Sequence, residues 1–217
     1  MGWGLLAAAL GGYLAGSLPF GYWLVRLTKG VDIRRVGSGN IGATNVWRTF
    51  GRRYGVPIVL LDTLKGFAPA FLAVRFDSHV AGVLAGAAAM LGHWRPIFLR
   101  FAKGGKMVAT CGGAFFGLAP AVAAVGGGLW IVVFVVFRYA SLASIVAALS
   151  LPALALVFDE PWPVVGFACA AALAVVVLHR ANIRRLANGT ENRFRLRRPR
   201  GGPAQPAQPA SQSRSSV

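Results

Sequence analysis

The sequence predicts an all-α, polytopic integral membrane protein with about seven transmembrane helices. Of its 217 residues, 56% are hydrophobic and only 13% are charged, which is about half the charged share of a soluble domain. The apolar stretches mostly run for about 18 residues or more, the length that crosses a bilayer core of roughly 30 Å. The basic residues also alternate between loops in the manner of a multi-pass membrane protein.

Seven apolar segments account for most of the chain, and Pro19 predicts a kink in the first of them. That segment lacks a basic n-region, so we interpret it as a true span rather than a cleaved signal peptide. We expect residues 1–200 to form a single transmembrane domain, followed by a disordered, Pro-, Gln- and Ser-rich tail over 201–217. The segments are 3–27, 54–74, 79–93, 104–119, 120–138, 139–158 and 161–179.

The basic residues predict how these segments are oriented. They gather after the first, third, fifth and seventh segments, whereas the opposite loops hold Arg75 with Asp77, Asp159 and Glu160. The positive-inside rule then places the N-terminus outside and the C-terminus in the cytoplasm. The formal net charge of +17 fits this topology and attraction to the anionic lipid of the bilayer. Nucleic acid is not an expected partner, because the basic residues are split among membrane loops.

The first polar cluster, "GSGNIGATNVWR" over Gly37–Arg48, combines glycines, hydroxyls, amides and a guanidinium. Its G-x-G-x-x-G spacing matches a dinucleotide-binding turn, and Asp62 follows at a suggestive distance. We reject that interpretation, because the preceding "VDIRRV" is short and charged and Asp62 lies inside an apolar run. Dense polarity at a bilayer boundary predicts a ligand site instead, with an ordinary N-capping loop as the alternative.

The second cluster, "KGGKMVAT" over Lys103–Thr110, has the composition of a phosphate cradle. Lys103 and Lys106 flank two glycines at the start of an apolar helix, where free N–H groups attract anions. We expect the amides of Gly104 and Gly105 to face a phosphate and the two lysines to neutralise it. The stretch does not match a Walker A loop, and the alternative is an ordinary positive-inside loop.

The third cluster, "HRANIRRLANGTEN" over 179–192, should place His179, Asn182 and Arg185 on nearby faces of one helix that ends at Asn188 and Gly189. Its alternative is a snorkelling amphipathic helix end. Together the clusters offer many cations and amides, while the whole chain has six carboxylates. This balance argues against a Mg²⁺ site. We therefore expect no metal and no cofactor, and predict recognition of phosphate by Arg, Lys and backbone N–H groups.

The motifs as a set resemble the bacterial acyl-phosphate:glycerol-3-phosphate acyltransferase family. The resemblance implies a seven-helix enzyme of the bacterial inner membrane with its active site near the cytoplasmic face. It implies acyl transfer from acyl-phosphate to the 1-hydroxyl of sn-glycerol 3-phosphate, giving lysophosphatidate and phosphate in phospholipid biosynthesis. The stretches that carry it, in order from about residue 13 to 192, are "YLAGSLPFGYWL", "DIRRVGSGNIGATNVWRTFG", "LLDTLKG", "GHWRPIFLRF", "KGGKMVAT" and "HRANIRRLANGTEN".

The chemistry implied is direct attack of the glycerol hydroxyl on the mixed anhydride, since the chain has no His-x-x-x-x-Asp pair and no G-x-S-x-G elbow. The proton passes to His179 or to the departing phosphate, and both remain open. The residues implied as catalytic are Ser38, Arg48, His179 and Asn182. Those assigned to substrate or phosphate binding are Gly37, Gly39, Asn40, Thr44, Asn45, Lys65, Lys103, Gly104, Gly105 and Lys106. Structural roles are assigned to Asp62 and Glu191.

Two places in the chain leave alternatives. Asp62 and Lys65, at i, i+3, form a buried ion pair, or Lys65 faces the active site. Compared with the family's usual "FKGGKGVAT", this chain has an extra Ala102 and has Met107 in place of glycine, so Met107→Gly is expected to be neutral or mildly helpful. A small membrane transporter or binding protein for organic anions or lipids is the alternative function. It is disfavoured because the polar residues cluster at one face without an inverted repeat.

Overall fold

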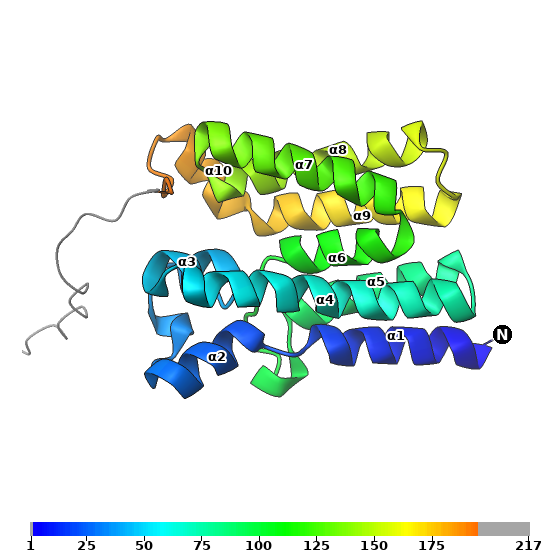
Figure 1. The fold of residues 1–217 in the computed structure, drawn as a ribbon, viewed down its shortest axis with the longest axis horizontal. Helices are drawn as coiled ribbons and strands as arrows, with labels where there is room; N and C mark the ends of the chain where they lie inside the picture. Colours follow the sequence, from blue (N-terminus) through cyan, green and yellow to red (C-terminus); the bar gives the residue numbers. More distant parts are fainter. Residues whose placement is uncertain (1, 195–217) are drawn as a thin grey trace, which may run out of the picture.

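The chain is helical throughout its regular structure over residues 2–194, the part that the computed structural model describes. This confirms the predicted all-α class (Figure 1). The predicted tail over 201–217 lies outside the described residues. Two short 3₁₀ helices, η1 (Ile33–Arg35) and η2 (Ile97–Leu99), lie in loops. The α-helices are α1 (Gly2–Gly16), α2 (Phe20–Lys29), α3 (Ala43–Phe50), α4 (Arg52–Phe76), α5 (His79–Trp94), α6 (Val108–Leu118), α7 (Pro120–Phe137), α8 (Ala140–Val157), α9 (Trp162–Leu178) and α10 (Arg180–Ala187).

The long helices pack side by side in two groups that α6 joins (Figure 1). Helices α1, α4 and α5 contact one another in the first group, and α8 contacts both α7 and α9 in the second. Helix α6 contacts α4 and α5 as well as α7 and α9. The rings of Phe115 in α6 and Phe167 in α9 stack with centroids 5.0 Å apart. The short helices α2, α3 and α10 lie at the same end of the bundle, and the polar clusters therefore meet there.

Small residues bring α1 directly onto α5. A Cβ added at Gly12 would collide with the backbone of Ala85, and one added at Gly16 would collide with the backbone of Ala89. Small residues at this spacing let helices approach closely in a membrane, where van der Waals contact drives their association. This close contact fixes the position of α5 against α1. The loop that contains Lys103 and Lys106 begins at the C-terminal end of α5.

The first apolar segment is broken, which confirms the kink that Pro19 predicted. Helix α1 ends at Gly16 and α2 begins at Phe20. A break of this kind frees backbone carbonyls, and the carbonyl of Leu18 accepts a hydrogen bond from Lys65 Nζ at 2.9 Å. The break is therefore satisfied by a side chain from α4, as irregular backbone inside a membrane requires.

Among residues 2–194, four helical segments are long and apolar enough to cross a membrane. They are Trp3–Lys29, Arg52–Phe76, Pro120–Phe137 and Ala140–Val157. A fifth results if α9 and α10, which meet at 60°, are counted as one bent span. Helix α5, with 16 residues, and α6, with 11, are shorter. These segments support a multi-pass membrane protein, and the count of seven spans stays a prediction.

Candidate active site

The loop before α3 is shaped by the side chain of Asn45. Its Nδ2 donates to the carbonyls of Val36 at 3.0 Å and Asn40 at 2.9 Å, and its Oδ1 accepts from the amide of Ser38 at 2.9 Å. Gly37 adopts φ 62° and a Cβ there would collide with Asn45 Oδ1, so glycine is required for this turn. Asn45 was assigned to substrate binding, but its polar atoms are used inside the loop. Asn45 therefore shapes this loop, and its role in substrate binding stays a prediction.

The same loop presents other predicted residues to its surface. Ser38 and Thr44 are exposed, and Gly39 turns the chain at φ 68°. Asn40 caps the turn by accepting from the amide of Gly42 at 2.8 Å, and its Nδ2 lies 3.4 Å from the carbonyl of Gly104. Asn40 thus connects the first polar cluster to the second.

The loop between α5 and α6 lies on the end of α5 through its own amides. The amide of Gly104 donates to the carbonyl of Trp94 and that of Gly105 to the carbonyl of His93, both at 2.9 Å. The hypothesis that these two amides face a phosphate is wrong for this structure, because both donors are already paired. A Cβ at Gly104 would collide with the His93 carbonyl, and one at Gly105 with the His93 ring. These glycines therefore allow close packing, which places the flanking lysines.

Met107, where the family usually has glycine, adopts the left-handed conformation with φ 67° and ψ −8° just before α6. A non-glycine residue there costs roughly 1–2 kcal/mol. The Met107 side chain is only 4% exposed and belongs to the core cluster with Cys111 and Phe115. Burial of this side chain offsets the strain, so the expectation that Met107→Gly is neutral or helpful ignores a lost core contact.

The bend between α9 and α10 falls at His179. Since the helix breaks at His179 with a 60° bend, the prediction that His179, Asn182 and Arg185 project from one helix is wrong. His179 ends α9, and the other two residues lie on α10. His179 Nδ1 lies 2.8 Å from the carbonyl of Val175. A carbonyl can only accept, so Nδ1 carries the proton and the Nε2 lone pair is left as a hydrogen-bond acceptor.

Glu191 holds the third cluster together from the segment after α10. Its Oε1 accepts from Ser141 Oγ at 2.8 Å and from Asn182 Nδ2 at 2.7 Å, and its Oε2 accepts from Arg185 Nε at 2.6 Å. The hydrogen bond from Asn182 is the largest cause that holds the pKa of this carboxyl below its usual value, against the opposing effect of burial. Glu191 is therefore an anion that orients Asn182 toward the remaining cations.

Lys106 joins the second cluster to the third. Its Nζ donates to Oδ1 of Asn182, 76 residues further along the chain. Burial lowers the pKa of Lys106 to about 8, while the negative charge of Glu191 raises it and the positive charge of Arg185 lowers it further. This ammonium is therefore held in a field with an excess of positive charge, which a bound anion would relieve.

Arg48 reaches the same region from α3. Its Nη2 donates to the carbonyl of Asn192 at 2.8 Å, and its guanidinium lies 5.0 Å from the ring centroid of Phe194. Its Nε is buried and has no hydrogen-bond partner among residues 2–194. Burial lowers the pKa of Arg48, the charge of Glu191 opposes that effect, and Arg185 adds to it. Three cations from three elements therefore surround one carboxylate.

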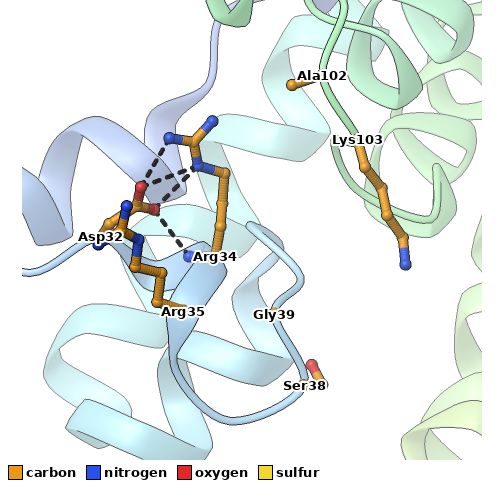
Figure 2. A pocket seen from close by; sticks show the side chains of 7 residues that line it. All are labelled: Asp32, Arg34, Arg35, Ser38, Gly39, Ala102 and Lys103. Atoms are coloured by element: carbon orange, nitrogen blue, oxygen red, sulfur yellow. Dashed lines mark hydrogen bonds and ion pairs between the residues drawn. The ribbon is translucent and has the colours of Figure 1, made fainter. Parts of the chain in front are cut away.

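A pocket of about 460 Å³ is lined by Ser38 and Lys103 (Figure 2), and Lys103 belongs to the same loop as Lys106. Arg34 from η1 also lines the pocket, where its guanidinium is paired with Asp32 at 2.7 Å. Sequence reasoning counted Arg34 and Arg35 only as topological charges, since nothing in their spacing marks a pocket. The lining residues are Asp32, Arg34, Arg35, Ser38, Gly39, Ala102 and Lys103.

Lys65 belongs neither to the cation cluster around Glu191 nor to the lining of the pocket. Its Nζ lies 2.8 Å from Oδ1 of Asp62, and both side chains are almost fully buried. A second N–H of its ammonium donates to the carbonyl of Leu18 at 2.9 Å. Of the two alternatives, the structure shows the buried ion pair, and the assignment of Lys65 to substrate binding stays a prediction.

The helices are apolar, and at one end of the bundle several cations gather around a single carboxylate. This combination defines a membrane-embedded protein with an anion-binding site at that end of its helices. A sequence model described as glycerol-3-phosphate acyltransferase matches residues 6–189. The chain belongs to the glycerol-3-phosphate acyltransferase family.

Named relatives and solved structures agree with this family. The glycerol-3-phosphate acyltransferase of Desulforudis audaxviator is 46% identical over 186 residues, which is 86% of this chain and 93% of the relative. That of Aquifex aeolicus is 46% identical over 185 residues, 84% of this chain and 95% of the relative. Crystal structures of PlsY, an integral membrane glycerol 3-phosphate acyltransferase, were solved in a glycerol 3-phosphate form and a lysophosphatidic acid form. Their TM-scores are 0.84 and 0.81, with 43% and 42% identity, covering 88% of this chain and 96% and 95% of those chains.

Proposed function

We propose that this protein transfers an acyl chain from acyl-phosphate to the 1-hydroxyl of sn-glycerol 3-phosphate. The products are lysophosphatidate and phosphate, and the reaction acylates glycerol 3-phosphate in phospholipid biosynthesis. The observation that carries the proposal is the convergence of Arg48, Lys106 and Arg185 around Glu191 at the end of the bundle. Both substrates bear phosphate, and a site with more cations than carboxylates stabilises phosphate by charge-assisted hydrogen bonds.

In the proposed reaction, Arg48 and Lys106 hold the phosphates, and Lys103 and Ser38 add contacts from the neighbouring pocket. The glycerol hydroxyl oxygen forms a bond to the acyl carbon, and the bond from that carbon to the phosphate oxygen breaks, so phosphate leaves with the electron pair. The hydroxyl proton goes to His179 Nε2, because the carbonyl of Val175 keeps the other ring nitrogen protonated. Catalysis rests on positioning and on charge stabilisation.

The proposed topology has seven spans in the bacterial inner membrane, with the site at the cytoplasmic face. Residues 1–200 form one catalytic domain, the N-terminus is outside and the C-terminus is in the cytoplasm. Two features of the bundle support this orientation. Helices α2, α3 and α10 share one end of the bundle (Figure 1) and together carry the basic residues Arg26, Lys29, Arg48, Arg180, Arg184 and Arg185. At the other end, the turns between α4 and α5 and between α8 and α9 contain no Arg or Lys, which fits the positive-inside rule.

An assay with purified protein and labelled glycerol 3-phosphate tests the function. We expect acyl-phosphate to support transfer without added metal, because the clusters lack the converging carboxylates that a metal needs. We expect acyl-CoA to support none, because the chain has no His-x-x-x-x-Asp pair. Arg48→Ala is the matched inactive control. It removes a charge-assisted contact of about 1.5–3 kcal/mol, and Arg48→Lys should restore little because an ammonium cannot bind phosphate bidentately.

Robust turnover with acyl-CoA would overturn the donor, and loss of activity in EDTA would overturn the metal-independent reaction. Wild-type kinetics in a monodisperse Arg48→Lys protein would remove Arg48 from phosphate binding. A wild-type protein that transfers no acyl group from either donor, yet binds glycerol 3-phosphate, would favour the transporter or binding-protein alternative.

A further inference from the structure

The residues after α10 form a segment that crosses the end of the bundle. We call residues 191–194 the closing segment. It begins at Glu191, whose carboxylate is anchored to α8 and α10 through Ser141 and Asn182. It ends at Phe194, whose amide donates to the carbonyl of Arg138 at 2.7 Å, just after α7. Both ends of the closing segment are thus fixed to the second group of helices.

The ring of Phe194 joins that group to α3. It makes edge contacts with Trp47 in α3 at 5.9 Å between ring centroids and with Phe134 in α7 at 5.2 Å. Phe194 is only 9% exposed. A buried ring with two aromatic neighbours has little freedom to move, because aromatic pairs at this separation are attractive and mutually oriented.

Arg48 rests on this ring. The guanidinium lies 5.0 Å from the centroid of Phe194, within the distance of a cation–π contact. Its Nη2 donates to the carbonyl of Asn192 in the same segment. The ring of Phe194 packs against the guanidinium of Arg48, and the carbonyl of Asn192 accepts a hydrogen bond from its edge. Together the two contacts determine the orientation of the guanidinium. The Nε of Arg48 is buried and has no hydrogen-bond partner among residues 2–194, so an anion that reached it would satisfy a donor that these contacts leave unpaired.

We propose that Phe194 is a positioning residue that orients the guanidinium of Arg48 toward substrate phosphate. The inference rests on the proposed function only for the role of Arg48. It also explains why the closing segment, far along the chain from Arg48, carries a buried aromatic side chain at a membrane boundary. Phe194 itself contacts no reacting atom.

The test compares Phe194→Leu, Phe194→Tyr and Arg193→Ala in the acyl-transfer assay. Phe194→Leu keeps an apolar side chain but loses the ring face, and should raise KM for one phosphate-bearing substrate by roughly 3- to 30-fold, with a smaller change in kcat. Phe194→Tyr keeps the face and should remain within about twofold of the wild type. Arg193→Ala is the matched control, because Arg193 lies in the same segment but faces the ring of Tyr139.

A double-mutant cycle separates positioning from folding. In an Arg48→Lys background, Phe194→Leu should raise KM by much less than in the wild type, because the oriented guanidinium is already gone. A purely structural role would lower the yield of active protein, leave KM unchanged and give the same loss in both backgrounds. Unchanged KM values in Phe194→Leu, with an active wild type, would overturn the inference while leaving the proposed function intact. An inactive wild type would overturn the function itself.

Discussion

Two buried polar clusters differ in how their charges are balanced. In the deep cluster, Lys65 and Asp62 carry one charge of each sign at 2.8 Å, and the spare donor of Lys65 caps the carbonyl of Leu18. In the cluster at the end of the bundle, Glu191 faces several cations, among them Lys106 and Arg48. The first cluster pairs its two charges, although the buried Nδ1 of His93, 3.8 Å from Asp62 Oδ1, has no hydrogen-bond partner among residues 2–194. The second cluster has positive charge left over. Within this molecule, charge balance therefore separates a structural site from a binding site.

The physical reason lies in the cost of burying charge. A single charge inside a membrane costs several kcal/mol, so Lys65 is retained there only with a counter-ion. At the boundary, water and ligand can supply the missing counter-charge, and an excess of cations can be maintained until an anion binds. Ser38 and Lys103, which lie near that cluster, are exposed, which agrees with access of water and ligand to this end of the bundle.

The largest expected effect comes from breaking the deep pair. Lys65→Met or Asp62→Asn alone should destabilise the protein by about 3–5 kcal/mol, because each leaves one buried group uncompensated. The double variant should recover a large part of this loss, although the carbonyl of Leu18 stays uncapped. Thermal unfolding in detergent measures all three. Single variants as stable as the wild type would mean that the pair is solvated and does not hold the break in the first segment.

A smaller effect concerns the protonation of Lys106. Its pKa is lowered to about 8, so its positive charge is present below pH 8 and is lost as the pH rises above it. KM for a phosphate-bearing substrate should therefore rise roughly tenfold for each pH unit above that value. Lys106→Arg should flatten this rise, because a guanidinium stays charged. Glu191→Gln should shift the rise to lower pH, since the charge of Glu191 opposes the lowering of this pKa.

KM profiles between pH 7 and 10 distinguish these outcomes. A rise of equal size in wild type and Lys106→Arg would assign the titration to another group and remove Lys106 from phosphate binding. The substrate phosphates do not interfere, because their second ionisation is complete below this range.

The smallest expected effect separates strain from packing at Met107. Both Met107→Ala and Met107→Gly lose a buried side chain, worth about 2–5 kcal/mol. The glycine variant recovers the left-handed strain, so it should be more stable than the alanine variant by about 1 kcal/mol. Unfolding midpoints of the two variants give this difference directly. An alanine variant that matches or exceeds the glycine variant would show that the backbone at Met107 relaxes.

Local sequence signals predicted the fold better than they predicted the contacts of the site. Hydrophobic length predicted the helices, and Pro19 predicted the break in the first segment, because both signals act within a few residues. The spacing of Asp62 and Lys65 was compatible with two environments, and only the position of α4 in the bundle selects between them. The bend at His179 carries no proline or glycine, so nothing in its sequence separated α9 from α10.

The contacts of the two glycines in the second cluster were missed for a different reason. Gly104 and Gly105 fit a phosphate cradle by composition, but their amides pair with backbone carbonyls of α5. A carbonyl partner has no side-chain signature, so the sequence could not show that these donors were used. Phe194 was missed for a related reason, since its partner Arg48 lies far away along the chain and one phenylalanine in a basic stretch is not a motif.

The break at Leu18 has a consequence for the order in which this membrane protein is assembled. The donor that satisfies the Leu18 carbonyl, Lys65, is 47 residues further along the chain. A ribosome therefore delivers the first apolar segment to the membrane well before the group that completes it. Until α4 arrives, a bent first segment would hold a bare carbonyl in hydrocarbon, which costs several kcal/mol. We expect the nascent first segment to insert as a straight helix or to remain at the membrane interface. It should bend only when α4 inserts beside it.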